Sequence, residues 1–127
     1  MKILHTVPNI DDEASGPSYT VPRLCEATAR LNHEVTLSCL KGEVVASNVN
    51  LITHSSWPIL KGFGISHKHI FSLMQNVHQM DIIHNHILWS MINMAAGWIV
   101  PGKNAKLVTS PRGTLSEWAM RHHGFRK

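Results

Sequence analysis

Short apolar runs bounded by turn residues recur along the chain and predict five β-strands. The runs cover Lys2–Val7, Glu34–Leu40, Val49–His54, Asp81–His86 and Ala105–Ser110. Lys2–Val7 and the stretch Lys106–Ser110 are apolar over most of their length, which is typical of strands in a sheet covered on both faces. We therefore expect a sheet with helices on its two sides.

Helical spacing of apolar residues follows the first strand. Val21, Leu24, Cys25, Thr28 and Leu31 fall on one helical face. Proline is tolerated only in the first turn of a helix, so Pro22 predicts that this helix begins near Thr20, with Thr20 as the N-cap. Asn32 can adopt the left-handed conformation that ends a helix.

Three further helices are expected in the second half of the chain. They are Ser66–Gln79 with Ser66 as a cap, Ser90–Val100 ended by Pro101-Gly102, and a last helix from near Ser116. The stretch with Trp57-Pro58 and Gly62-Phe63-Gly64 reads as an irregular loop.

Strands that alternate with helices form βαβ units, which give a parallel sheet with right-handed crossovers. The fold class predicted is therefore α/β, a Rossmann-like parallel sheet flanked by helices, with strand order 3-2-1-4-5. The chain has 127 residues, which suits one domain with a modest core.

Composition and charge narrow the range of partners. The chain is 43% hydrophobic and 16% charged, as ordinary globular proteins are. Of a net charge of +4, the excess lies in residues 81–127, which hold six bases and two acids. A basic end suits phosphate, an anionic surface or nucleic acid. Aromatic residues are not interleaved with these bases, so we expect no nucleic-acid partner.

Cysteine usage and the apolar runs bear on localisation. Cys25 and Cys39 lie in apolar contexts without CxxC spacing, which predicts buried, reduced thiols and a cytoplasmic protein. The longest apolar run, Ile87–Val100, is interrupted by Ser90 and Asn93 and is shorter than the ~20 residues of a membrane span.

Three features fall at the carboxyl ends of the predicted strands, where such sheets bind ligands. The first is Gly16-Pro17-Ser18, where a glycine and a helix N-terminus favour phosphate or a hydroxyl cluster. Its alternative is an ordinary turn glycine with a proline set for the start of a helix. The sequence has no GxGxxG, so a dinucleotide cofactor is not expected.

The second and third features are a histidine pair and an arginine. His84 and His86 alternate on a strand, so they share one face. They either contact a polar ligand or bind a metal, although a zinc site needs three or four ligands, and we expect no metal. Arg112, followed by Gly113, offers a fixed positive fork for phosphate or carboxylate, or is simply a surface arginine on a turn.

Ordered phrases along the whole chain resemble the N-terminal half of GT-B glycosyltransferases of the family 4 type. A glycine-containing loop follows strand one, and the next helix ends in a Gly-His-Glu-Val phrase, here Asn32-His33-Glu34-Val35. A strand of the form D-hydrophobic-hydrophobic-H-x-H follows, here Asp81–His86. The remaining phrases are Leu88-Trp89, the Asn- and Ala-containing helix around Asn93–Ala96, Ser110-Pro-Arg-Gly113 and the helix with Trp118-Ala119.

The resemblance implies transfer of a sugar from a nucleotide-sugar to a glycan or lipid-linked acceptor, with retention and without a metal or resident cofactor. In that family the N-terminal domain holds the acceptor, and a C-terminal domain holds the donor. By resemblance, Gly16 approaches the donor phosphate. Arg112-Gly113 stands where many members have histidine-glycine. Because an arginine stays protonated, Arg112 is expected to stabilise charge in catalysis and not to act as a base.

The same resemblance implies that residues 1–127 are one truncated N-terminal domain, with the donor-binding domain absent. We expect such a piece to be inactive alone, with the acceptor side lined by Gly16, Pro17, Ser18, His84, His86, Arg112 and Gly113. The family's setting is polysaccharide or lipopolysaccharide assembly at the inner membrane face. The alternative is a non-enzymatic Rossmann-like module that binds phosphate or sugar-phosphate on Gly16 and Arg112.

A truncated domain is expected to leave apolar surface uncovered and therefore to self-associate, for example by exchange of its last helix. Light scattering at high protein concentration should show dimers or larger species. A monodisperse monomer under those conditions would contradict the expectation.

Overall fold

Five parallel strands form the single sheet of the described chain, in the order β3-β2-β1-β4-β5. The computed structural model describes residues 1–11, 16–43, 46–55 and 65–123. The strands are β1 (Lys2–Thr6), β2 (Glu34–Cys39), β3 (Asn50–Thr53), β4 (Ile82–His86) and β5 (Lys106–Ser110). The α/β fold and the strand order predicted from the sequence are confirmed. The loop expected around Trp57-Pro58 and Gly62–Gly64 lies outside the described residues.

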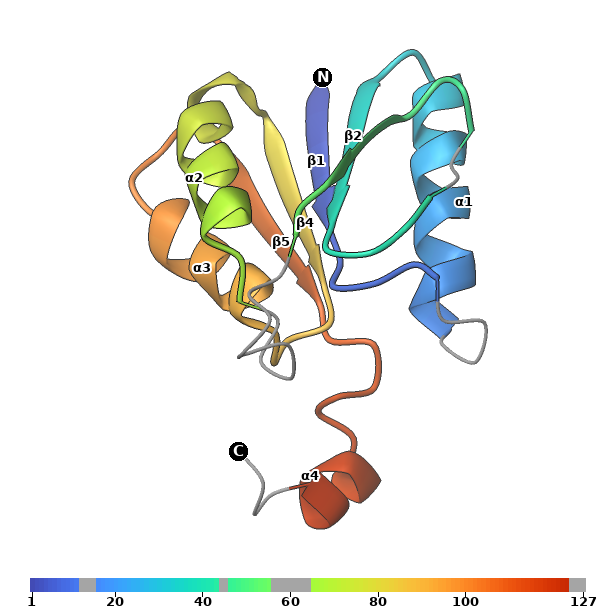
Figure 1. Ribbon diagram of the computed structural model, residues 1–127, viewed down its shortest axis with the longest axis vertical. Coiled ribbons are helices and arrows are strands. Elements are labelled where there is room, and N and C mark those ends of the chain that lie inside the picture. The colour runs from blue at the N-terminus through green and yellow to red at the C-terminus, as the bar shows by residue number, and fades with distance from the viewer. Residues whose placement is uncertain (12–15, 44–45, 56–64, 124–127) are drawn as a thin grey trace.

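Helices cover the two faces of this sheet in an uneven way (Figure 1). The helix α1 (Gly16–Arg30) lies on one side, and α2 (His67–Asn76) and α3 (Met91–Ile99) lie on the other. A short 3-10 helix, η2 (Val77–Gln79), continues α2. The helix α4 (Glu117–His123) stands beyond the carboxyl ends of the strands, away from both layers (Figure 1).

Each side of the sheet has its own apolar core. The core under α2 and α3 joins Leu4 and Ile83 of the sheet to Leu73 and Ala96 of the helices. The core under α1 is formed by Val7, Val21, Cys25, Val35, Leu37, Cys39 and Val49. Both cysteines are free and buried, and burial raises the pKa of the Cys25 thiol to about 12. The prediction of buried, unpaired thiols is therefore confirmed.

The expectation that the strand Lys106–Ser110 is covered on both faces is wrong. Its first four residues are exposed, including Val108 at 43%. The strand lies at the edge of the described sheet, and α1 packs mainly on β2. An apolar run therefore does not distinguish an edge strand from a central one.

The start of α1 also differs from the prediction. The helix begins at Gly16 and passes through Pro22, so Thr20 is not its N-cap. The Thr20 hydroxyl instead donates to the Gly16 carbonyl at 2.9 Å. A proline inside a helix removes one backbone hydrogen bond. The helix continues because Val21 and Cys25, on either side of Pro22, are fully buried against the sheet.

The other predicted helix ends agree with the structure. Asn32 has a φ of 62°, in the left-handed region that ends α1. The Ser66 hydroxyl accepts a bond from the His69 amide at 3.2 Å and caps α2. The Ser116 hydroxyl accepts from the Ala119 amide at 3.3 Å, directly before α4.

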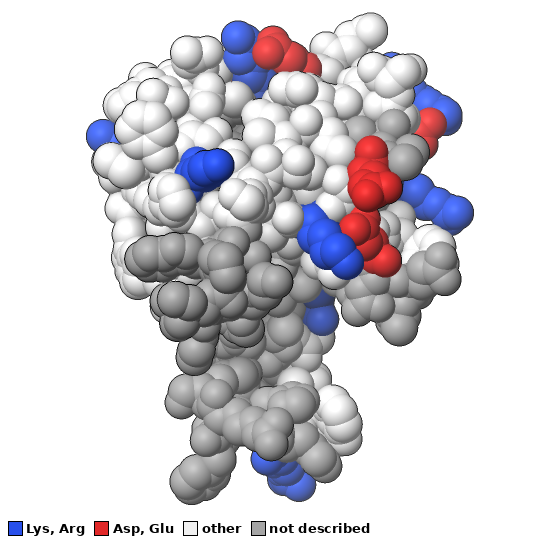
Figure 2. Space-filling model, in the orientation of Figure 1, with Lys and Arg blue, Asp and Glu red and all other residues white. Residues whose placement is uncertain are grey.

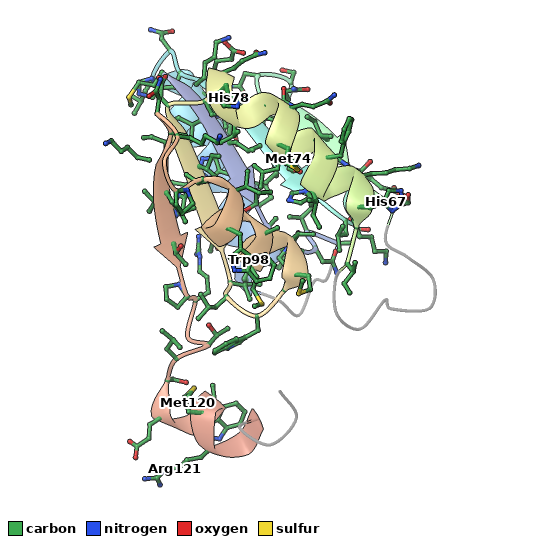
Figure 3. All side chains as sticks on the ribbon, turned by 90° about the vertical axis from the view of Figure 1, so that its left-hand side faces the viewer. His67, Met74, His78, Trp98, Met120 and Arg121 are labelled. Carbon is green, nitrogen blue, oxygen red and sulfur yellow. The ribbon has the colours of Figure 1, made fainter. Side chains whose placement is uncertain are left out.

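Large apolar side chains are exposed on the outer helices. Met74 on α2 and Trp98 on α3 lie on the outer surface (Figure 3), and Trp98 is 67% exposed. Residues 65–80 and 82–116 contain no acidic residue. Figure 2 accordingly shows no acidic side chain over α2 and α3. Within the described parts of the chain, every helix is too short or too polar to cross a membrane.

A buried asparagine ties α3 to the carboxyl ends of the central strands. Asn93 Nδ2 donates to the His86 carbonyl at 2.7 Å, and Asn85 Nδ2 donates to the Asn93 carbonyl at 2.8 Å. The Thr6 hydroxyl donates to Asn85 Oδ1. These side chains are almost inaccessible to water. Asn93 therefore fixes the end of β4 to α3.

The substitution Asn93→Ala should lower the free energy of unfolding by about 1–3 kcal/mol, because the buried His86 carbonyl loses its side-chain donor. Urea unfolding measures the difference. The neighbouring Met94→Ala, at a 39% exposed position, should change it by less than about 0.5 kcal/mol. Equal effects of the two substitutions would show that the Asn93 bridge does not stabilise the fold.

Candidate functional site

Three histidines meet near the carboxyl ends of β1 and β4. His5 pairs with His84 in the parallel register, and His86 lies two residues further along β4. Residues two apart on a strand share a face. The ring centroids lie 5.1 Å apart for His5 and His84, 5.3 Å for His5 and His86, and 4.1 Å for His84 and His86. His5 and His86 are buried and His84 is half-buried. We call these three residues the histidine cluster.

Arg112 reaches this cluster from the segment after β5. Its Nη2 lies 3.1 Å from His86 Nδ1, and its Nη1 donates to the Thr20 hydroxyl on α1 at 2.8 Å. The guanidinium thus bridges the first turns of α1 and the end of β4. Arg112 itself is exposed.

The backbone has a left-handed conformation at Arg112 and directly after the end of β4. Arg112 has a φ of 53°, Gly113 a φ of 79°, and Ile87, directly after His86, a φ of 72°. The left-handed region suits glycine but is unfavourable for a β-branched residue such as isoleucine. Two non-glycine residues in this region beside one cluster indicate local strain of the kind found at binding sites.

The arginine determines which ring nitrogens carry hydrogen. A guanidinium only donates, so Nδ1 of His86 must accept. In neutral His86 the hydrogen is then on Nε2, which lies 3.0 Å from His5 Nδ1 and donates to it. His5 consequently carries its hydrogen on Nε2. That atom is buried, and no described residue accepts from it.

Burial and neighbouring positive charge keep the cluster neutral. Burial is the largest cause of a lowered pKa in all three residues. The pKa falls to about 4 for His5, where His84 and then Arg112 add to the effect, and to about 3 for His86. In His84 the pKa is lowered by burial and then by Arg112. At neutral pH the only fixed charge of the site is therefore that of Arg112, among the groups that the structure describes.

The structure brings together some of the expected site residues and not others. His84 and His86 lie in the cluster, Arg112 contacts it, and Gly113 provides the turn that follows. The glycine at position 16 starts α1, and a Cβ there would meet nothing within 4 Å, so packing does not require glycine. Pro17 is half-buried in the first turn of α1. The Ser18 hydroxyl oxygen is buried, with no hydrogen-bond partner among the described residues.

Three residues of the site were missed by the reading of the sequence. His5 looked like part of an apolar strand, Thr20 like a helix cap and Ser110 like a strand end. Ser110 Oγ lies 2.8 Å from His84 Nε2 and orients that ring. His5 had a usable signal, because the predicted strand order already placed Lys2–Val7 beside Asp81–His86.

The chemistry of the site follows from these contacts. Arg112 can bind an anion, since it is always charged and carries free donor positions beyond its two contacts. The cluster offers three ring nitrogens within 4.8 Å of one another, which is a possible metal-ligand set. Arg112 lies against that set and opposes a cation as the structure stands.

A second buried polar cluster lies on the opposite face of the sheet. Ser38 Oγ lies 3.0 Å from His69 Nδ1 and 3.1 Å from His54 Nε2. Burial, followed by His54, lowers the pKa of His69 to about 4. A cavity of about 140 Å³ between β2 and α2 is lined by Ser38 and His69 among others. Ser38 thus joins β2 to α2 and to His54, directly after β3, while His69 Nε2 is buried without a hydrogen-bond partner among the described residues.

Comparison of the sequence with protein-family models finds no matching family, and comparison with curated proteins finds no significant relative.

The neutral cluster predicts a pH dependence of stability. In the unfolded chain His5 and His86 titrate near pH 6.5, whereas in the folded chain they take up protons only near pH 4 and pH 3. Stability is therefore complete above pH 6.5 and falls as the pH falls from 6.5 toward 4. For each histidine that is protonated in the unfolded chain but neutral in the folded chain, the free energy of unfolding should fall by about 1.4 kcal/mol per pH unit. Urea unfolding at a series of pH values measures this slope.

Ring resonances in NMR spectra give the direct measurement. Those of His5 and His86 should show no titration midpoint between pH 8 and pH 5. A midpoint between pH 6 and pH 7 for either ring would contradict the assignment of a neutral buried cluster.

Proposed function

We propose that this chain supplies the acceptor-side half of a retaining glycosyltransferase, with Arg112 as its phosphate-binding residue. The observation that carries the proposal is the position of the Arg112 guanidinium. It lies at the carboxyl edge of a 3-2-1-4-5 parallel sheet and contacts both α1 and β4. Ligands of this class of sheet bind at that edge.

The contacts of Arg112 favour an anion as its ligand. Two nitrogens of the guanidinium are held by Thr20 and His86, which orients the planar group. Its remaining donors form a fork that matches phosphate oxygens. Thr20 lies one turn after the start of α1 at Gly16, and the positive end of the helix dipole favours negative charge near this end. These features support binding of an acceptor phosphate or stabilisation of a departing diphosphate.

The protonation pattern limits what the histidines do in this function. His86 Nδ1 accepts from Arg112, and His5 Nδ1 accepts from His86. Both rings are therefore engaged as acceptors and are poor general bases. Arg112 stabilises charge, while His86 and His5 position it. This division agrees with sugar transfer in which leaving-group charge is the main demand on the site.

The remaining parts of the proposal concern partners and setting. The acceptor is a glycan or lipid-linked sugar, and the nucleotide-sugar donor binds to a separate domain. The chain alone is then inactive. The process is polysaccharide or lipopolysaccharide assembly, at the cytoplasmic face of the inner membrane, and the exposed apolar residues of α2, α3 and α4 support self-association of the isolated chain.

A second candidate is a non-enzymatic module that binds phosphate or sugar-phosphate. One observation favours it: both groups that hold Arg112 belong to this chain. The anion site is thus formed without a second domain. The two candidates share Arg112 and differ in whether a glycan is recognised beside the phosphate.

Calorimetry with glucose 1-phosphate at low salt tests the shared step. Arg112→Gln should weaken binding about tenfold or more, because a charge-assisted hydrogen bond contributes about 1.5–3 kcal/mol. Arg121→Gln removes the same charge from α4 (Figure 3). Arg121 pairs there with Glu117. That control should bind like the unmodified chain. Absence of phosphate binding by the unmodified chain would contradict both candidates.

A panel of ligands then separates the two candidates. An acceptor half should bind a lipid-linked or oligosaccharide phosphate more tightly than glucose 1-phosphate, and nucleotides poorly. Equal binding of nucleotides and sugar-phosphates would favour the non-enzymatic module. Sugar transfer from a nucleotide-sugar by this chain alone would contradict the assignment of donor binding to another domain.

A further inference from the structure

We propose that His5, His84 and His86 form a binding site for a divalent transition-metal ion, and that Arg112 competes with the ion for His86. This site is additional to the proposed anion site and does not depend on a glycosyltransferase function. It differs from the expectation drawn from the sequence, in which His84 and His86 were too few to hold a metal. The third ligand, His5, comes from β1.

The geometry of the three rings carries the proposal. One nitrogen from each ring lies within 4.8 Å of the others, and His5 Nδ1 and His86 Nε2 are 3.0 Å apart. Nitrogens bound to one zinc ion at about 2.0–2.1 Å lie roughly 3.3 Å from each other in a tetrahedral site. Binding one ion therefore requires ring nitrogens that lie up to 4.8 Å apart to approach one another by roughly 1.5 Å.

The pairing of β1 with β4 and a contact from Ser110 hold the rings in position for metal binding. His5 and His84 are paired residues of adjacent strands, and His86 is on the same face of β4. The ring of His84 is oriented by Ser110, as metal-binding histidines are usually oriented through their second nitrogen. His5 already has its Nδ1 lone pair directed at the cluster, since Arg112 fixes the hydrogen of His5 on Nε2.

His86 cannot bind the metal ion and accept a hydrogen bond from Arg112 at the same time. If the ion binds Nδ1, it takes the position of the guanidinium. If the ion binds Nε2, the hydrogen of the neutral ring moves to Nδ1, which then cannot accept from Arg112. In both cases the guanidinium must leave. Arg112 is exposed, and among the contacts described for its side chain, the hydrogen bonds to Thr20 and His86 must break for it to turn outward.

The ligand set determines the class of ion. Three imidazoles suit zinc, cobalt, nickel or copper, whereas magnesium and calcium prefer oxygen ligands. Three protein ligands also leave one coordination position for water or a substrate. The half-buried His84 marks the side on which that position meets solvent.

Titration with cobalt(II) at pH 7.5, in buffer without phosphate, tests the proposal by visible absorption. The unmodified chain should bind one ion with the intense bands of tetrahedral cobalt. Arg112→Gln should bind about tenfold more tightly or better, since a charge near His86 is removed and its nitrogen is freed. Arg121→Gln removes an equal charge at a distance and should leave the affinity unchanged (Figure 3).

Removal of a ligand gives the complementary result. His84→Ala, at a half-buried position that should tolerate the change, should weaken cobalt binding about tenfold or more. His78→Ala, at an exposed position on η2 (Figure 3), should not. Circular dichroism confirms that each variant is folded.

Two outcomes would overturn the proposal: cobalt binding that survives in folded His84→Ala, or an affinity that does not rise in Arg112→Gln. The same arginine substitution is expected to weaken anion binding and to strengthen metal binding. Failure of one proposal is therefore distinguishable from failure of the other.

Discussion

Arg112 can donate hydrogen bonds but never accept them, and the hydrogen positions of the histidine cluster follow from that property. The guanidinium makes His86 an acceptor at Nδ1 and a donor at Nε2, and this in turn makes His5 an acceptor at Nδ1. One surface residue thus determines the direction of the hydrogen bonds that run from Arg112 through His86 to the buried His5. The chain ends on a buried N–H without a described partner, which costs stability.

The rest of the fold maintains this arrangement at some cost. Ile87 and Arg112 both have left-handed backbones, each unfavourable by about 1–2 kcal/mol. The cost is offset by the apolar cores on either side of the sheet and by the buried amides that join α3 to β4. The left-handed Ile87 and Arg112 and the unsatisfied donor of His5 lie together toward the carboxyl edge of the sheet. That distribution is typical of proteins that bind ligands at this edge.

Much of the fold could be predicted from the sequence because its signals are local. Apolar runs gave the strands, Asn32 and Ser66 gave helix ends, and alternation placed His84 and His86 on one face. The start of α1 was wrong because burial of Val21 and Cys25 outweighs the preference of Pro22 for a first turn. The exposure of β5 depends on which elements pack against it, and the residues of the strand itself do not indicate that. His5 and Thr20 belong to the site only through contacts between distant segments.

Asn93 connects the outer surface of the molecule to the histidine cluster through a hydrogen bond. Its side chain donates a hydrogen bond to the His86 carbonyl, while Met94 and Trp98 of the same helix are exposed on the outer surface. A shift of α3 along its axis by a fraction of a turn would break this hydrogen bond or displace the end of β4 together with the helix. A molecule bound over Trp98 would therefore contact the same helix whose Asn93 side chain holds the His86 carbonyl.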